Sequence, residues 1–266
     1  MNELLQNNIS RLKRAPVFMF HRVVERIPSG PLYDIHYTAE NLENLIRFLR
    51  KRGYEAITFG DLLIREVPRK PVMLTFDDGY EDHYTHLFPM LKKHGIKAVI
   101  YLLGDRTVGS NVWDISKGAV EAPLLRKEQI LEMAASGFVE FGGHSMTHAK
   151  LTELSPAEME RQIRECKSSL EALLGKPILS FAYPYGFFND GIKKAVAESG
   201  YLFGIAVEWG PDYFGEDLME IRRVCLSPDA GKLEFFWKTS FLYPAFRRWQ
   251  KRLKLDKQKP ASVRKI

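Results

Sequence analysis

Two adjacent carboxylates, Asp77 and Asp78, follow an apolar run and precede Gly79 in the segment TFDDG. Neighbouring carboxylates at the end of a buried strand repel each other and lose hydration, and a bound cation relieves both costs. Gly79 permits a tight turn that can direct both side chains to one place. Taken alone, this segment is equally well interpreted as a solvated turn that caps a helix.

Two histidines, His144 and His148, stand four residues apart after another predicted strand. On a helical turn this spacing puts both imidazoles on one face, where they can reach one metal ion. A surface or capping role is an equally good interpretation of a histidine pair alone. Together, however, Asp78, His144 and His148 supply three protein ligands and leave positions for water, as is typical of catalytic metal sites.

The segments that must position these residues are short β-rich runs that alternate with helical periods. We predict helices over 38–52 and 80–93, and a third that begins after Ser155, as a capping box with proline at its first position, and ends at Gly175. Runs that are apolar on both faces predict strands of a covered parallel sheet, over 16–20, 56–58, 72–76, 98–102, 138–141, 179–182, 203–207 and 221–226. These β–α units predict an α/β barrel, closed or nearly so, with its chemistry at the carboxyl ends of the strands.

A third strand end carries FAYPYG, residues 181–186, whose simplest interpretation is a rigid turn with packed aromatic residues. In this order and spacing, TFDDG, HSMTH (144–148) and FAYPYG resemble the motifs of the polysaccharide deacetylase family, also called the NodB-homology or carbohydrate esterase 4 group. The resemblance extends from about residue 16 to residue 226. It implies a distorted (β/α) barrel and metal-dependent hydrolysis of an N-acetyl group on a sugar.

The resemblance also implies roles for individual residues. Asp77 matches the catalytic base, and Asp78, His144 and His148 match the ligands of a divalent metal ion, which we expect to be Zn²⁺. Tyr185 matches the position whose backbone N–H contributes to the oxyanion hole. These are the residues on which catalysis would depend.

The sequence departs from the family pattern at the third motif, where Ala182 stands in the place of a common arginine. We expect Arg223, in preference to Arg222, to replace that arginine and to orient Asp77. Adjacent arginines on a strand are otherwise one surface group and one salt-bridged group.

A second departure is that no histidine follows His148, so the usual general acid is missing. The segment FHRV, residues 20–23, resembles the opening of a subgroup that includes poly-N-acetylglucosamine deacetylases and shares the FAYPYG form. We therefore expect His21 to act as the acid, although an ordinary polar strand end is the simpler interpretation of this residue alone.

Candidate sugar-binding residues lie near these motifs. The long connection over 104–124 suggests a lid or a rim, with Trp113 as a stacking platform. A surface loop anchored by one tryptophan is the alternative interpretation. Tyr183, within the third motif, is a second candidate for substrate binding.

The charge of the chain is unevenly distributed. Of its 266 residues, 45% are hydrophobic and 27% are charged, and the net charge is +6. This composition excludes a wholly disordered chain, a collagen and a small protein held together by disulfides. Residues 231–266 hold 11 basic and 2 acidic groups, and the first 230 residues hold 28 basic and 31 acidic groups. We therefore expect a slightly acidic barrel over 1–230 and a basic, aromatic extension over 231–266.

The extension can form an amphipathic helix. Its aromatic and apolar face would hold Tyr243, Phe246, Trp249 and Leu253, and its basic residues are Arg247, Arg248, Lys251, Arg252 and Lys254. This pattern is typical of a helix that lies on a membrane surface, and a helix packed on the barrel is the alternative. Membrane contact would favour a lipid-linked sugar as substrate. We do not expect a nucleic-acid partner, because the barrel is acidic and no nucleic-acid-binding module is recognisable.

The sequence also suggests a compartment. No apolar stretch approaches the length of a membrane span, and residues 1–14 lack the apolar region of a signal peptide. Cys166 falls on the apolar stripe of a predicted helix and Cys225 in a predicted strand, so we interpret both as buried thiols. We expect a cytoplasmic protein, or one at the inner surface of the membrane.

We therefore expect a metal-dependent hydrolase that removes N-acetyl groups from an amino sugar in a glycan or a lipid-linked glycan. Two alternatives stay open. One is a catalytically impaired barrel that binds glycan, given the missing late motifs, and the other is a hydrolase of another small amide or a formyl group.

Overall fold

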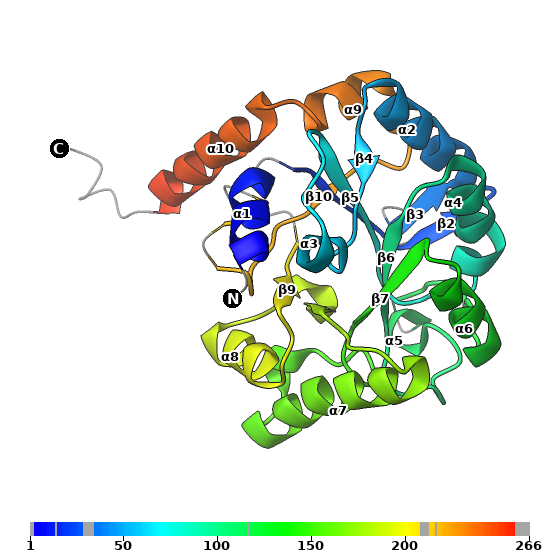
Figure 1. The fold of residues 1–266 in the computed structure, drawn as a ribbon. Helices are drawn as coiled ribbons and strands as arrows, with labels where there is room; N and C mark the ends of the chain where they lie inside the picture. The colour runs from blue at the N-terminus through cyan, green and yellow to red at the C-terminus, as the bar shows by residue number, and fades with distance from the viewer. Residues whose placement is uncertain are drawn as a thin grey trace.

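The computed structural model describes residues 3–13, 15–28, 35–115, 117–207, 213–215 and 217–258, and for residues 251–258 only the backbone. Its main sheet contains seven parallel strands in the order β10-β1-β5-β6-β7-β8-β9, and the short β4 pairs with β5 beside this series. The strands curl around a common centre, and most helices lie outside them (Figure 1). The predicted α/β barrel is therefore confirmed, in the form of a distorted and incompletely closed barrel.

The strands lie close to the predicted positions because continuous apolar runs form them. Their bounds are β1 Val17–Phe20, β4 Glu55–Ala56, β5 Pro71–Phe76, β6 Ala98–Leu102, β7 Val139–Gly143, β8 Ser180–Ala182, β9 Phe203–Ile205 and β10 Val224–Cys225. The segment predicted as one strand over 221–226 is divided. Ile221 forms a parallel bridge with Ile205, and β10 pairs with β1, so this segment connects the two ends of the sheet.

The helices mostly follow their sequence signals. Ser155 accepts a hydrogen bond from the backbone N–H of Glu158 at the start of α7, and Gly175 ends it with a φ of 66°. The described helices around the sheet are α2 Ala39–Lys51, α4 Phe88–His94, α5 Val112–Ile115, α6 Lys127–Ala135, α7 Pro156–Leu174, α8 Asp190–Glu198 and α9 Lys232–Lys238. None of the described helices is both long enough and apolar enough to cross a membrane.

The continuous helix predicted over 80–93 is wrong. Tyr80 forms an antiparallel bridge with Leu124, and helical structure begins only with the π-helix η2, His83–Leu87, which leads into α4. Pro89, near the start of α4, has no N–H to donate to the carbonyl of Thr85, which accounts for the interruption of regular α-helical bonding between η2 and α4.

Four elements that the sequence pattern did not predict complete this part of the architecture. β2 Arg22–Val24 and β3 His36–Thr38 form a two-stranded parallel sheet that follows β1. At the amino ends of the strands, α1 Glu3–Leu12 packs on α3 Asp61–Ile64. The buried side chain of Asn8 joins them, donating to the carbonyls of Leu62 and Arg65 and accepting from the N–H of Val67.

Residues 231–258 form two helices. α9 packs on α2, with the ring of Phe235 at 5.6 Å from that of Phe48. α10, Leu242–Gln258, follows and extends away from the barrel (Figure 1). On it Tyr243 is buried and Trp249 is exposed, while the side chains of Leu253, Lys251, Arg252 and Lys254 lie outside the described residues.

Candidate metal centre

Asp78, His144 and His148 converge at the carboxyl ends of β5 and β7. Asp78 Oδ1 lies 3.3 Å from Nε2 of His144 and 3.2 Å from Nε2 of His148. One potential ligand atom from each residue lies within 4.8 Å of the other two, and all three residues are buried. The structure therefore brings together the three residues that the sequence predicts as metal ligands.

Unusual backbone conformations produce this convergence. Asp78, Ser145 and His148 have φ values of 71°, 62° and 59°, in the left-handed region that non-glycine residues rarely adopt. A fourth such residue, Tyr185, has a φ of 57° and lies in the third motif. Because each costs free energy that the surrounding structure must supply, their concentration here indicates a functional site.

The chemistry of the three side chains fits a divalent cation. The Nδ1–H of His144 donates to the carbonyl of Ala182 at 2.7 Å, which leaves the Nε2 lone pair of a neutral imidazole directed at Asp78. Asp78 Oδ1 has no hydrogen-bond partner among the described residues. A cation between these lone pairs removes their repulsion, and two imidazoles with one carboxylate are suitable ligands for it.

Aromatic rings enclose this centre. The ring of Trp113 stacks on that of His148 at 4.4 Å between centroids, and the ring of Tyr185 meets His148 edge-on at 4.5 Å. Trp113 lies on α5, in the long connection that the sequence suggested as a rim. It therefore packs directly on a candidate metal ligand.

Asp77 does not belong to this cluster of candidate ligands and is held by Arg223. The guanidinium binds both carboxylate oxygens, at 2.6 Å (Nη1–Oδ1) and 2.8 Å (Nη2–Oδ2), and both residues are buried. Burial alone would raise the pKa of Asp77, but the positive charge of Arg223 outweighs it and lowers the pKa. Arg222 instead pairs with Glu220. The structure thus places Arg223, not Arg222, where the sequence expected an orienting arginine.

His21, directly after β1, also lies near Asp77. Its Nε2 is 3.8 Å from Asp77 Oδ2, and the side chain is partly exposed. Its carbonyl accepts a hydrogen bond from Nε2 of His83, in the π-helix, at 2.5 Å. Asp82 binds the side chain of the following Arg22 at 2.6 Å. Sequence reasoning missed Asp82 and His83, and their position shortly after the TFDDG motif was the one available signal.

His21, Asp77, Arg223 and the three candidate ligands line a cavity of about 240 Å³. Its lining also includes Trp113, Tyr183 and Tyr185. The hydroxyl of Tyr183 donates to the carbonyl of Met219 at 2.8 Å, so only its ring borders the cavity. At the rim, the ammonium of Lys117 lies 4.5 Å from the centre of the Tyr185 ring. The cavity therefore joins a candidate metal centre, a separate carboxylate, an imidazole and aromatic walls.

A comparison with family models gives a match to polysaccharide deacetylase over residues 64–204. The chain belongs to the polysaccharide deacetylase family. The match includes Asp77, the three candidate ligands and Tyr185, whereas His21 and Arg223 lie outside it, so their inclusion in the site depends on geometry.

Individual relatives cover most of the chain. It is 28% identical over 220 residues to YxkH of Bacillus subtilis, across 81% of this chain and 72% of that protein. It is 24% identical over 233 residues to the poly-β-1,6-N-acetyl-D-glucosamine N-deacetylase of Staphylococcus epidermidis, across 79% of this chain and 78% of that protein. Among solved structures, a polysaccharide deacetylase from Bacillus cereus is 25% identical with a TM-score of 0.71, covering 85% of this chain and 69% of that one.

The fold is shared more widely than the sequence. The deacetylase PplD of Streptococcus pyogenes is 21% identical with a TM-score of 0.71, covering 85% of this chain and 98% of that one. The barrel described above is therefore the architecture of the family.

Proposed function

We propose that this protein is a metal-dependent N-deacetylase that hydrolyses the N-acetyl group of an amino sugar within a glycan. The observation that carries the proposal is the buried Asp78, His144 and His148 cluster beside a second carboxylate, Asp77, that Arg223 keeps ionised. Amide hydrolysis needs both an electrophilic centre and a base, and the cavity provides positions for both.

Asp78, His144 and His148 would hold the cation, and we propose Zn²⁺ because catalytic zinc sites use such ligands and leave a position for water. Zn²⁺ bound there supplies Lewis-acid chemistry, which lowers the pKa of water and polarises the acetyl carbonyl. Because Trp113 and Tyr185 pack on His148, they exclude bulk water from one side of the centre.

The remaining residues would move protons and stabilise charge. Asp77 accepts a proton from the attacking water, whose oxygen forms a new bond to the acetyl carbon. The backbone N–H of Tyr185 stabilises the developing oxyanion. His21 donates a proton to the sugar nitrogen as the C–N bond breaks, which yields acetate and a free amine.

The proposed substrate is a polymer of an N-acetylated amino sugar, with a lipid-linked sugar as the second class to test. The relative from Staphylococcus epidermidis carries the name of an enzyme acting on poly-β-1,6-N-acetyl-D-glucosamine, which supports the polymer. Trp113 and Tyr183 would form the walls against which a sugar ring packs.

The test is acetate release from N-acetylglucosamine oligomers, polymers and lipid-linked sugars. We expect chelation to abolish release and Zn²⁺ to restore it, and Asp77→Asn to lower kcat by roughly 100-fold or more. Asp190→Asn, at a fully exposed side chain, is the matched control and should behave as the wild type.

Activity that survives both chelation and Asp77→Asn would reject this mechanism. Tight glycan binding without acetate release would instead indicate a catalytically impaired barrel. Release of formate or another acid would assign the protein to a different amide.

We also propose that α10 and the preceding turn contact a membrane and that the protein is cytoplasmic. Phe241, Leu242 and Trp249 are exposed. A cleft of about 500 Å³ beside Phe241 and Leu242 is lined by basic side chains, namely Arg11, Arg52, Arg69 and Lys70. Exposed aromatic and apolar residues beside cations favour the surface of an anionic bilayer.

Co-sedimentation with vesicles of phosphatidylcholine, with and without phosphatidylglycerol, tests this contact, and cell fractionation tests the location. We expect binding only to the anionic vesicles, and loss of most binding in Phe241→Ser/Leu242→Ser. Leu131→Ser/Leu202→Ser removes exposed apolar residues elsewhere and is the control. Equal binding to neutral vesicles, or none to either, would contradict the proposal.

A further inference from the structure

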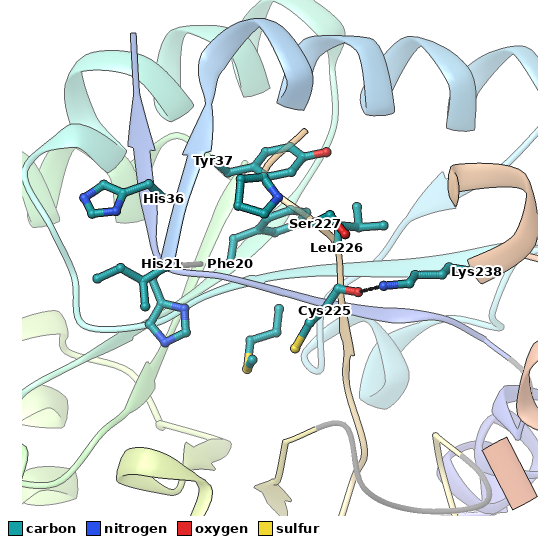
Figure 2. A pocket seen from close by; sticks show the side chains of 11 residues that line it. Phe20, His21, His36, Tyr37, Cys225, Leu226, Ser227 and Lys238 are labelled. Atoms are coloured by element: carbon teal, nitrogen blue, oxygen red, sulfur yellow. Dashed lines mark hydrogen bonds between the residues drawn. The ribbon is translucent and has the colours of Figure 1, made fainter. Parts of the chain in front are cut away.

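A second cavity adjoins the catalytic cavity beside His21. It measures about 290 Å³, and Met19, His21 and Ile35 line both cavities. Figure 2 shows His21 and Cys225 along one edge of this second cavity, with Tyr37 across from them. A ligand seated in the catalytic cavity can therefore extend past His21 into this space.

The walls of the second cavity are mainly apolar, with a few polar groups. Met19, Leu226 and Pro228 contribute apolar surface. The polar side chains among its lining residues include those of His21, His36 and Ser227. A sugar ring has apolar C–H faces and hydroxyl groups, so it matches a pocket with apolar walls and isolated polar groups.

The charges around the cavity do not select an anion. Lys238, on its wall, donates to the carbonyl of Cys225 (Figure 2) and pairs with Glu234 at 2.8 Å. Glu234 also accepts a hydrogen bond from the backbone N–H of Ser227 at 3.0 Å. Because Glu234 compensates the charge of Lys238, a neutral ligand suits this cavity better than a phosphate or a carboxylate.

We propose that the second cavity is an accessory subsite for the sugar unit next to the one that loses its acetyl group. This inference rests on the proposed deacetylase function. In that reaction His21 protonates the sugar nitrogen, so the reacting sugar lies beside His21 and its neighbour in the chain reaches the second cavity. At about 290 Å³ the cavity lies near the lower end of the range of small-ligand pockets, roughly 300–1,000 Å³, as a site for one sugar unit requires.

Thiol labelling tests the occupancy of this subsite directly. Cys225 lines the cavity and is half-buried, whereas Cys166 is fully buried and its burial raises its pKa to about 11, so it serves as an unreactive internal control. Asp77→Asn protein, which should turn over the ligand at least roughly 100-fold more slowly, is treated with methyl methanethiosulfonate in the presence of an N-acetylglucosamine tetramer. At ten times its Kd the tetramer should slow modification of Cys225 roughly tenfold, because the free fraction falls in that proportion.

Two results of this experiment would overturn the subsite. One is a tetramer that binds and leaves the labelling rate of Cys225 unchanged. The other is a tetramer that binds no more tightly than N-acetylglucosamine itself, since a second sugar in the cavity must add affinity.

A variant gives an independent measurement. Ser227 is exposed at the edge of the cavity, so Ser227→Phe should fold and should narrow the space. We expect kcat/KM for the tetramer to fall roughly tenfold, with that for the monosaccharide unchanged. Ser168→Phe, at an exposed position of α7, is the control. Unchanged kcat/KM for both ligands in Ser227→Phe would contradict the subsite. Absence of acetate release from either ligand by the wild type would reject the deacetylase function instead.

Discussion

Asp77 and Asp78 are neighbours in the sequence but serve two different environments. The left-handed backbone at Asp78 separates the two side chains, so that one faces Arg223 and the other faces the imidazoles of His144 and His148. Each carboxylate is thereby stabilised by its own cationic or metal-binding partner. Division of this kind allows adjacent carboxylates to take different chemical roles.

Replacement of Arg223 tests the first of these environments. Arg223→Met leaves Asp77 buried without its cation, so the pKa of Asp77 should rise, the free energy of unfolding should fall by about 3–5 kcal/mol, and acetate release should decrease strongly. Arg222→Met is the matched control, and it should cost less than about 1 kcal/mol because Arg222 is partly exposed. Chemical denaturation measures the free energy of unfolding of both variants. An equal decrease in the two would show that Arg223 has no special role.

Connections between elements account for the stability of the barrel away from the site. Asn8 of α1 makes three hydrogen bonds to α3 and the residues after it. Asn8→Ala leaves the two carbonyls and the N–H without these partners. We therefore expect the free energy of unfolding to fall by about 2–3 kcal/mol. The exposed Asn7 provides the control Asn7→Ala, which should change the free energy of unfolding by less than about 0.5 kcal/mol. Similar values for the two variants would contradict a structural role for α1.

A second connection depends on pH. Glu43 of α2 accepts hydrogen bonds from Lys93 and His94 of α4, which lower its pKa from 4.5 to about 2. A carboxylate with a lowered pKa contributes stability that is complete above pH 4.5 and is lost as the pH falls towards 2. The free energy of unfolding of the wild type should therefore exceed that of Glu43→Gln by up to about 1 kcal/mol at pH 6, and by less at pH 3.

Urea denaturation at the two pH values measures this difference. Glu160→Gln, at an exposed position of α7, is the control. A difference between wild type and Glu43→Gln that grows on acidification would have the wrong sign for this mechanism.

The sequence predicted the strands and the convergence of the three candidate ligands because both depend on local patterns: apolar runs, a glycine turn and a histidine spacing. It did not predict the hydrogen bond between His83 and the carbonyl of His21, which joins residues 62 positions apart. Nor did it predict the contact of Asn8 with Leu62, across 54 positions. Such contacts depend on how the elements pack, and the interruption by the π-helix depends on the position of Pro89 within that packing.

Metal binding should appear as a property of the whole molecule. A cation that binds only the folded protein stabilises it by about 4 kcal/mol at a concentration 1,000 times its Kd. We therefore expect Zn²⁺ to raise the Tm of the wild type and chelation to lower it, with neither effect in Asp78→Ala. His86→Ala, which alters a histidine outside the cluster, should keep the response. A Tm shift of equal size in Asp78→Ala would place the binding elsewhere.

The position of α10 has a consequence for reach. The cleft beside its first residue includes Pro16 and Pro71, at the amino ends of β1 and β5, whereas Asp77 follows the carboxyl end of β5. The six residues of β5 span about 20 Å. If the protein contacts a bilayer through this cleft, its catalytic cavity would lie about 20 Å from the membrane surface. Its catalytic cavity would meet glycan chains that project from the membrane surface. The first sugars attached to a lipid would lie closer to the bilayer than the cavity.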